Sequence, residues 1–209
     1  MRAEAERNSP SSSDSETGGV ASPVVAQDVR RDMIKWQVIH GDLLDISADG
    51  LICSANPNLN LSGGVGGAFS MRYGGEMQEF LHAHLREQKL RVVPPGTVVI
   101  SPGFSSPFPH VAHAVAIDVF YDTNAELILQ TYFTAIQQLA AAGCRSIAAA
   151  CLGCGYGRCP EAEFLKSIER LIATLIATPL ENVDHITLAT TNEALADSLR
   201  QLPAFHSAF

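Results

Sequence analysis

Residues 146–160 read SIAAACLGCGYGRCP, an apolar segment followed by alternating glycines and then a proline. The apolar part, Ser146–Leu152, is typical of a buried β-strand. Alternating glycines let a backbone adopt positive φ and bring its N–H groups close to an anion, although the same loop could be a simple flexible turn. Proline is common in the first turn of a helix, so Pro160 marks a helix start. The stretch therefore predicts a strand, a glycine loop and a helix in that order.

The rest of the chain repeats this alternation of strands and helices. Strand-like runs occupy Ile34–His40, Gly50–Ser54, Thr97–Ser101, Val111–Ile117 and His185–Thr190. Helical spacing covers Glu76–Gln88, Ala125–Ala142, Glu161–Thr178 and Asn192–Leu202. Thr123 and Glu126 form a capping-box pattern before the second of these helices, and Gly143 is placed to end it. The alternation predicts a three-layer α/β/α sandwich with a mixed, largely parallel sheet of about six strands.

Two further strand ends carry unusual residues. Ser62–Gly67 holds four glycines soon after Asn56, and residues 68–73 behind it could be helical. Gly41-Asp42 follows the first strand. Because ligands collect at the carboxyl ends of parallel strands, two glycine loops there could clamp both phosphates of a diphosphate. Asp42 could cap a helix or accept the amino group of adenine, and Asn56 could form an Asx turn or bind ribose hydroxyls.

Two familiar nucleotide-binding patterns fit less well. A P-loop would end in Gly-Lys followed by Ser or Thr, whereas this loop ends in Arg158-Cys159-Pro160. A dinucleotide-binding oxidoreductase would end its next strand in an acidic residue, whereas the strand here ends in Thr190-Thr191. The sequence therefore favours neither a P-loop nor a dinucleotide-binding oxidoreductase.

Charge and composition restrict the class of partner. The net charge of −8 gives no broad field for nucleic acid, so a bound phosphate would be held mainly by backbone N–H groups. No apolar run approaches the roughly 18 residues that span a bilayer. An odd number of cysteines argues against a secreted disulfide framework, so we expect a cytoplasmic protein. Residues 1–31 are rich in Ser, Pro and acidic side chains and predict a disordered tail, followed by one domain over residues 32–209.

The cysteines and histidines raise two further hypotheses. Cys151, Cys154 and Cys159 lie close together, but no second Cys-x-x-Cys pair exists, so neither a metal nor another cofactor is expected. His113 is interpreted as a buried structural histidine. A Cys–His nucleophile at Cys154 remains open, although no spacing singles it out.

Taken together, these residues resemble the macro domain, the ADP-ribose-binding module. The resemblance covers about residues 33–202 and rests on Gly41-Asp42, the Ser54-Ala55-Asn56 strand end, Gly63-Gly64-Val65, the His113 strand and the Gly153–Pro160 loop. It implies that Asp42 accepts the adenine amino group and that Leu43 adds a backbone contact. Asn56 would hold the distal ribose, Tyr156 would flank it, and residues 190–192 would close over adenine. The ligand-binding residues expected on this basis are Asp42, Leu43, Asn56, Gly63, Gly64, Val65, Gly66, Gly153, Cys154, Gly155, Tyr156 and Gly157.

The chain also departs from the family pattern. The usual Asn-Ala-Ala-Asn reads Cys53-Ser54-Ala55-Asn56, a usual proline is replaced near Ala150, and Arg158 stands where a glycine is usual. The branch that removes ADP-ribose from proteins has an Asp at the position of Gly66. The resemblance therefore implies binding of ADP-ribose, or of a mono-ADP-ribosyl group on a protein. The alternative is hydrolysis of ADP-ribosyl esters, O-acetyl-ADP-ribose or ADP-ribose phosphate by a water that the diphosphate positions.

Overall fold

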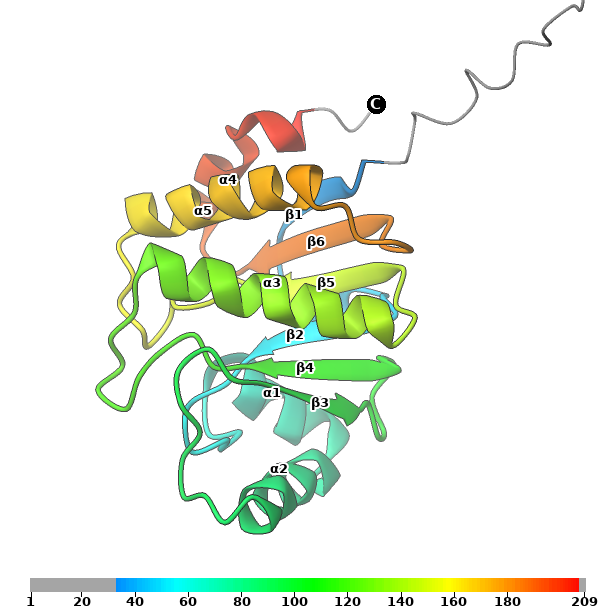
Figure 1. The fold of residues 1–209 in the computed structure, drawn as a ribbon, viewed down its shortest axis with the longest axis vertical. Coiled ribbons are helices and arrows are strands. Elements are labelled where there is room, and N and C mark those ends of the chain that lie inside the picture. Colours follow the sequence, from blue (N-terminus) through cyan, green and yellow to red (C-terminus); the bar gives the residue numbers. More distant parts are fainter. Residues whose placement is uncertain (1–32, 207–209) are drawn as a thin grey trace, which may run out of the picture. The chain divides into compact units, whose positions relative to one another are not determined.

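The computed structural model describes residues 33–206, which form a six-stranded sheet between two layers of helices (Figure 1). The tail expected over residues 1–31 lies outside the described residues. The strands are β1 (Lys35–His40), β2 (Gly50–Ser54), β3 (Val98–Pro102), β4 (His110–Ala114), β5 (Ser146–Ala150) and β6 (His185–Thr190). The helices are α1 (Gly64–Tyr73), α2 (Glu76–Glu87), α3 (Ala125–Ala141), α4 (Glu161–Ala177) and α5 (Glu193–Arg200), with short 3-10 turns η1 (Leu43–Asp45) and η2 (Pro203–Phe205).

The strand order β1-β6-β5-β2-β4-β3 brings the candidate loops together. Only β3 runs antiparallel to its neighbour, β4, and every other neighbouring pair is parallel. Strand β2 lies between β4 and β5, and Gly50 is in register with both His110 and Ile147. The loops that leave the carboxyl ends of β2, β4 and β5 are therefore neighbours on one edge of the sheet. The mixed, largely parallel sheet predicted from the sequence is confirmed.

Both faces of the sheet are buried, and successive side chains of β2 pack on opposite faces. Ile52 packs in a core cluster with residues of α3, α4 and α5, whereas Leu51 packs in a second cluster with residues of α1 and α2. Helices α3 and α4 lie in front of the sheet in Figure 1, and α1 lies behind it. The predicted three-layer sandwich is confirmed. No helix within residues 33–206 is long and apolar enough to cross a membrane.

The N-cap of α3 and the start of α1 differ from the sequence prediction. The N-cap of α3 is Asn124, whose side chain accepts the Leu127 N–H, whereas Thr123 donates its hydroxyl to the Ala116 carbonyl. The capping box on Thr123 was therefore wrong by one residue, because the adjacent strand exit engages the threonine. Helix α1 begins at Gly64, inside the glycine run, rather than after it. Gly143 follows α3 with φ of +88°, so it ends that helix as predicted.

Candidate functional site

A cavity of about 250 Å³ opens at the carboxyl ends of β2, β4 and β5. Three loops line it, those between β2 and α1, between β4 and α3, and between β5 and α4. None of the described residues that line it carries a charged side chain or an imidazole. These residues are Ser54, Ala55, Asn56, Asn60, Ser62, Gly63, Gly64, Val65, Ile117, Tyr121, Ala150, Cys151, Gly153, Gly155, Tyr156 and Gly157. The polar groups of the cavity are therefore backbone amides, hydroxyls, two Asn side chains and a thiol.

The first glycine loop brings the start of α1 to the cavity. Gly63, Gly64 and Val65 line the cavity and form the N-cap and first turn of this helix. The first N–H groups of a helix have no partner inside the helix, and the helix dipole makes this end partly positive. Gly64 has φ of +53°, a conformation that glycine adopts without strain. The loop therefore brings the partly positive start of a helix to the cavity.

Asn56 and Gln78 hold this loop in place. The Asn56 side chain donates to the Asn60 carbonyl at 2.9 Å and accepts the Asn60 N–H at 3.1 Å. Gln78, from α2, accepts the Leu61 N–H and donates to the Leu59 carbonyl. Asn56 thus holds the loop through Asn60, four residues on, rather than through the Asx turn considered for it, and a contact with ribose stays a prediction.

The second glycine loop is closely folded. Gly153 has φ of +78°, and its carbonyl accepts the Cys159 N–H at 3.0 Å. A Cβ on Gly157 would lie 2.8 Å from the Gly153 oxygen and 2.7 Å from Ile117 Cγ2, so this position excludes a side chain. A Cβ on Gly155 would meet nothing within 4 Å. Gly155 lines the cavity and is exposed, so the packing of the loop does not exclude a side chain there.

Two tyrosines form the outer edge of the cavity. Tyr156 comes from the second glycine loop, and its hydroxyl would lie 3.0 Å from a Cβ on Gly63, so the ring reaches the first loop. Tyr121 comes from the loop between β4 and α3, and its ring centroid lies 6.3 Å from that of Tyr156. The pair closes one side of the cavity between all three loops.

Tyr132 of α3 fixes the start of the second glycine loop to the core. Its ring is 1% exposed, its hydroxyl donates to the Ala150 carbonyl, and the Leu152 N–H donates to the same hydroxyl at 3.0 Å. One buried side chain thus satisfies backbone groups on both sides of Cys151, a lining residue. The Tyr132 hydroxyl therefore fixes the backbone at the point where the second glycine loop leaves β5.

The thiols and His113 do not form a catalytic pair. Burial raises the pKa of Cys151 to about 12 and also raises the pKa of Cys154, so both thiols are protonated at neutral pH. Burial lowers the pKa of His113 to about 3, and its Nε2 contacts Ser101 and Met77. Met77 belongs to α2, whereas Cys154 packs on the core cluster of α3 and α4, on the other face of the sheet. His113 is the buried structural histidine that the sequence indicated.

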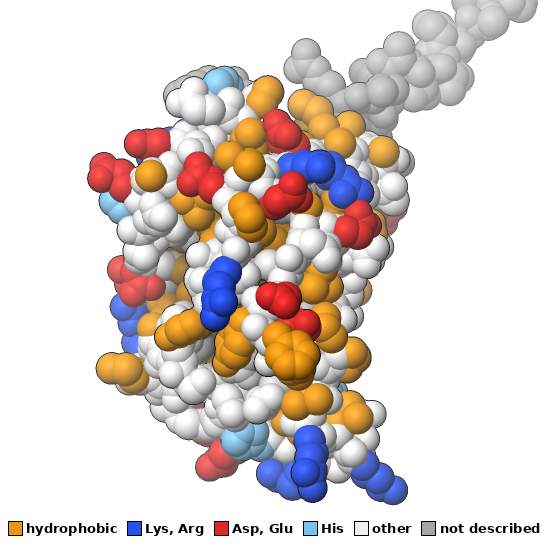
Figure 2. Space-filling model, turned by 90° about the vertical axis from the view of Figure 1, so that its left-hand side faces the viewer, with side chains coloured by type: hydrophobic (Ala, Val, Ile, Leu, Met, Phe, Trp, Pro, Cys, Tyr) orange, Lys and Arg blue, Asp and Glu red, His pale blue; other side chains and the backbone are white. Residues whose placement is uncertain are grey.

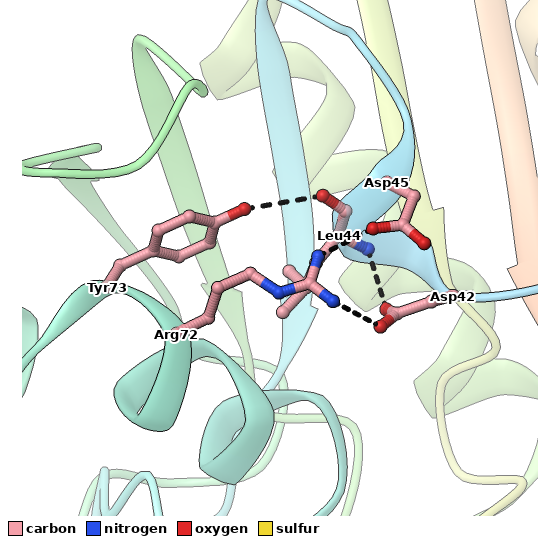
Figure 3. A network of polar contacts seen from close by, with 5 residues as sticks. All are labelled: Asp42, Leu44, Asp45, Arg72 and Tyr73. Carbon is pink, nitrogen blue, oxygen red and sulfur yellow. Dashed lines mark hydrogen bonds and ion pairs between the residues drawn. The ribbon is translucent and has the colours of Figure 1, made fainter.

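Asp42 belongs to a polar network at the end of α1 and does not line the cavity (Figure 3). Its Oδ1 accepts the Leu44 N–H at 2.9 Å and so caps η1. Its Oδ2 pairs with Arg72 at 2.9 Å, and Arg72 also pairs with Asp45 at 2.7 Å. Tyr73 donates its hydroxyl to the Leu44 carbonyl. The capping role considered for Asp42 is present, and about half the acceptor sites of its carboxylate stay open to a ligand.

The structure brings eight of the twelve expected site residues to the cavity. Outside the lining are Asp42, half-buried Cys154, and the buried Leu43 and Gly66. Gly66 lies inside the first turn of α1, where a Cβ would be 3.1 Å from Leu61 Cδ2. The lining residues that sequence reasoning missed include Tyr121 and Ile117. Their loop has no glycine, and its one signal is the run Val119-Phe120-Tyr121, three large apolar residues before a helix cap.

Comparisons with known proteins agree with this geometry. The family model described as the macro domain matches residues 52–168. An O-acetyl-ADP-ribose deacetylase of Citrobacter rodentium is 30% identical over 68% of this chain and 82% of that protein. An uncharacterized protein of Thermoplasma volcanium is 30% identical over 58% of this chain, which spans 66% of that protein's length. The solved macrodomain of Trypanosoma brucei in complex with ADP-ribose has a TM-score of 0.66 at 20% identity, covering 82% of this chain and 71% of that one. That last likeness is one of fold.

Proposed function

The chain belongs to the macro domain family, and from this premise we propose that its cavity binds the diphosphate and distal ribose of ADP-ribose, free or attached to a protein. The Trypanosoma brucei macrodomain has been solved in complex with ADP and in complex with ADP-ribose. The cavity volume of about 250 Å³ is just below the roughly 300–1,000 Å³ of most small-molecule sites. It therefore suits part of a dinucleotide, and in this proposal the adenine lies outside it, toward Asp42.

The observation that carries the proposal is the pairing of two glycine loops over a cavity without charged side chains. Gly63 and Gly64 present the first turn of a helix, and Gly153, Gly155 and Gly157 present a loop whose backbone a ligand can approach closely. A diphosphate is the ligand that such backbone donors suit best, because it carries several acceptor oxygens and two negative charges. A neutral ligand would gain little from this arrangement.

We expect ADP-ribose to bind at least tenfold more tightly than AMP. AMP lacks the second phosphate and the distal ribose, and each hydrogen bond to a charged group contributes about 1.5–3 kcal/mol, which exceeds the 1.4 kcal/mol of a tenfold change. Isothermal titration calorimetry with both ligands at one salt concentration measures the ratio. Equal affinities would mean that the two loops do not act together on a diphosphate.

A second candidate function is hydrolysis, because relatives such as the Citrobacter rodentium protein are described as O-acetyl-ADP-ribose deacetylases. In this chain no described residue that lines the cavity offers a carboxylate or an imidazole as a general base. The mechanism that remains is attack by a water that the bound diphosphate positions. Positioned general acid–base catalysis typically supplies about 10²–10⁴-fold, so its absence favours binding over turnover.

We expect single-turnover hydrolysis of O-acetyl-ADP-ribose, and of a peptide ADP-ribosylated on Glu, to stay within about tenfold of the uncatalysed rate. The assay is run with protein in excess and followed by chromatography of the released ADP-ribose. Acceleration of about 10²-fold or more would replace the binding proposal with the diphosphate-positioned water. The variant Gly66→Asp does not enter this test, because its Cβ would lie 3.1 Å from Leu61 Cδ2 and the Leu61 side chain would have to shift.

A further inference from the structure

An exposed hydrophobic surface adjoins the cavity. It consists of Val119, Phe120, Tyr121 and Tyr156, which we call the rim, and these side chains are 53%, 76%, 43% and 69% exposed. Figure 2 shows hydrophobic side chains gathered on the middle of the face that carries the strand ends. Tyr121 and Tyr156 line the cavity, whereas Val119 and Phe120 do not. The rim is therefore continuous with the cavity and extends beyond it.

The exposure of the rim does not result from a loose loop. Asp118 Oδ1 accepts the N–H groups of Phe120 and Asp122, both at 2.8 Å, and the Asp118 N–H donates to the Asp122 carbonyl. Tyr121 is held at φ of +67°, a conformation that costs free energy for an aromatic residue. The backbone thus fixes large apolar side chains in solvent, and a fixed surface of this kind marks an interaction site.

We propose that the rim binds the polypeptide to which a mono-ADP-ribosyl group is attached, by contacting apolar side chains next to the modified residue. The proposal rests on the proposed function. A mono-ADP-ribosyl group is joined to its acceptor through the distal ribose, and its adenine end is free. With the distal ribose in the cavity, beside Tyr121 and Tyr156, the acceptor chain leaves across Val119 and Phe120.

The charge around the rim selects a polypeptide over a nucleic acid. Asp118 and Asp122 belong to the same loop, and Asp122 is exposed, whereas the neighbouring loop carries the exposed cation Arg158 two residues after Tyr156. The chain as a whole carries −8. With two carboxylates against one guanidinium, a phosphate backbone gains little attraction at this position, whereas an apolar peptide segment does not depend on charge.

The test compares free ADP-ribose with two mono-ADP-ribosylated peptides, one with Leu and one with Ser on both sides of the modified residue. We expect the unaltered chain to bind the Leu-flanked peptide about tenfold more tightly than the Ser-flanked one, since burial of an apolar side chain supplies an effect of that size. In the double variant Val119→Ser, Phe120→Ser the two peptides should bind equally, and the affinity for free ADP-ribose should be unchanged. Ile176→Ser, at a 61% exposed position on α4, removes similar apolar surface and should retain the preference.

The outcomes separate the two proposals. Failure of the unaltered chain to bind free ADP-ribose would overturn the proposed function and the rim proposal with it. Binding of ADP-ribose with no Leu preference, or with a preference that survives in the double variant, would overturn the rim proposal alone. An ADP-ribosylated oligonucleotide that binds more tightly than the peptides, and loses this advantage in the double variant, would show that the partner is a nucleic acid instead.

Discussion

The Gly155→Glu variant is expected to lose at least a hundredfold in ADP-ribose affinity while keeping its fold. A Cβ at this position meets nothing within 4 Å, so the domain accommodates a side chain there. The new carboxylate would enter the space assigned to the diphosphate. At about 4 Å and an effective dielectric constant of about 20, two like charges repel by about 4 kcal/mol, and each 1.4 kcal/mol is tenfold in affinity. Calorimetry measures the loss, and circular dichroism checks the fold.

Two control variants separate the effects of charge, side-chain size and position on the affinity for ADP-ribose. Gly75→Glu adds the same charge at an exposed glycine whose Cβ also meets nothing within 4 Å, and it should bind normally because Gly75 does not line the cavity. Gly155→Gln adds the same bulk without charge and should lose less affinity than Gly155→Glu. A folded Gly155→Glu protein that binds ADP-ribose as the unaltered chain does would show that the second glycine loop does not contact the ligand.

Tyr132→Phe is expected to lower the free energy of unfolding by about 2–4 kcal/mol. The substitution removes the hydroxyl that joins the Ala150 carbonyl and the Leu152 N–H, and a buried polar group without a partner costs about 1–3 kcal/mol. Because the second glycine loop starts at the next residue, ADP-ribose affinity should fall as well. Urea denaturation followed by circular dichroism measures the change in stability.

Tyr73→Phe is the matched control for this variant. Its hydroxyl donates to the Leu44 carbonyl at 3.3 Å from a half-buried position, where water can replace the bond. We expect a loss below about 1 kcal/mol. If Tyr132→Phe loses no more than Tyr73→Phe, the phenol does not fix the path of the loop.

The fold was largely predictable because hydrophobic spacing and the glycine loops agree. Strands β2 and β6 have the predicted bounds, and α2, α3 and α4 each end one residue before the prediction. The start of α1 was missed because glycine has a low intrinsic helix propensity. In the folded protein that propensity is overridden by packing, since Phe69 is buried among α2 and the sheet, and Gly66 fits closely against Leu61.

The candidate site was less predictable because part of it depends on strand order. The sequence identifies both glycine loops, but not that β2 lies between β4 and β5. That placement brings Tyr121 to Tyr156, although 35 residues separate them in the chain. Likewise, no local signal pairs Arg72 with Asp42, since the contact joins the end of α1 to the exit of β1.

Helix α1 joins the cavity to the position proposed for adenine beside Asp42. Its first turn faces the cavity and its last turn holds Asp42 through Arg72, and ten helical residues extend about 15 Å. In the proposed function, a helix of this length fixes the distance between the site of the adenine and the site of the distal ribose. A ligand would then need the correct length as well as the correct chemical groups. Removing one residue from α1 would shorten the helix by about 1.5 Å and rotate one end by about 100° relative to the other. In the proposed function, the length of α1 therefore sets the distance between the groups that contact the adenine and those that contact the distal ribose.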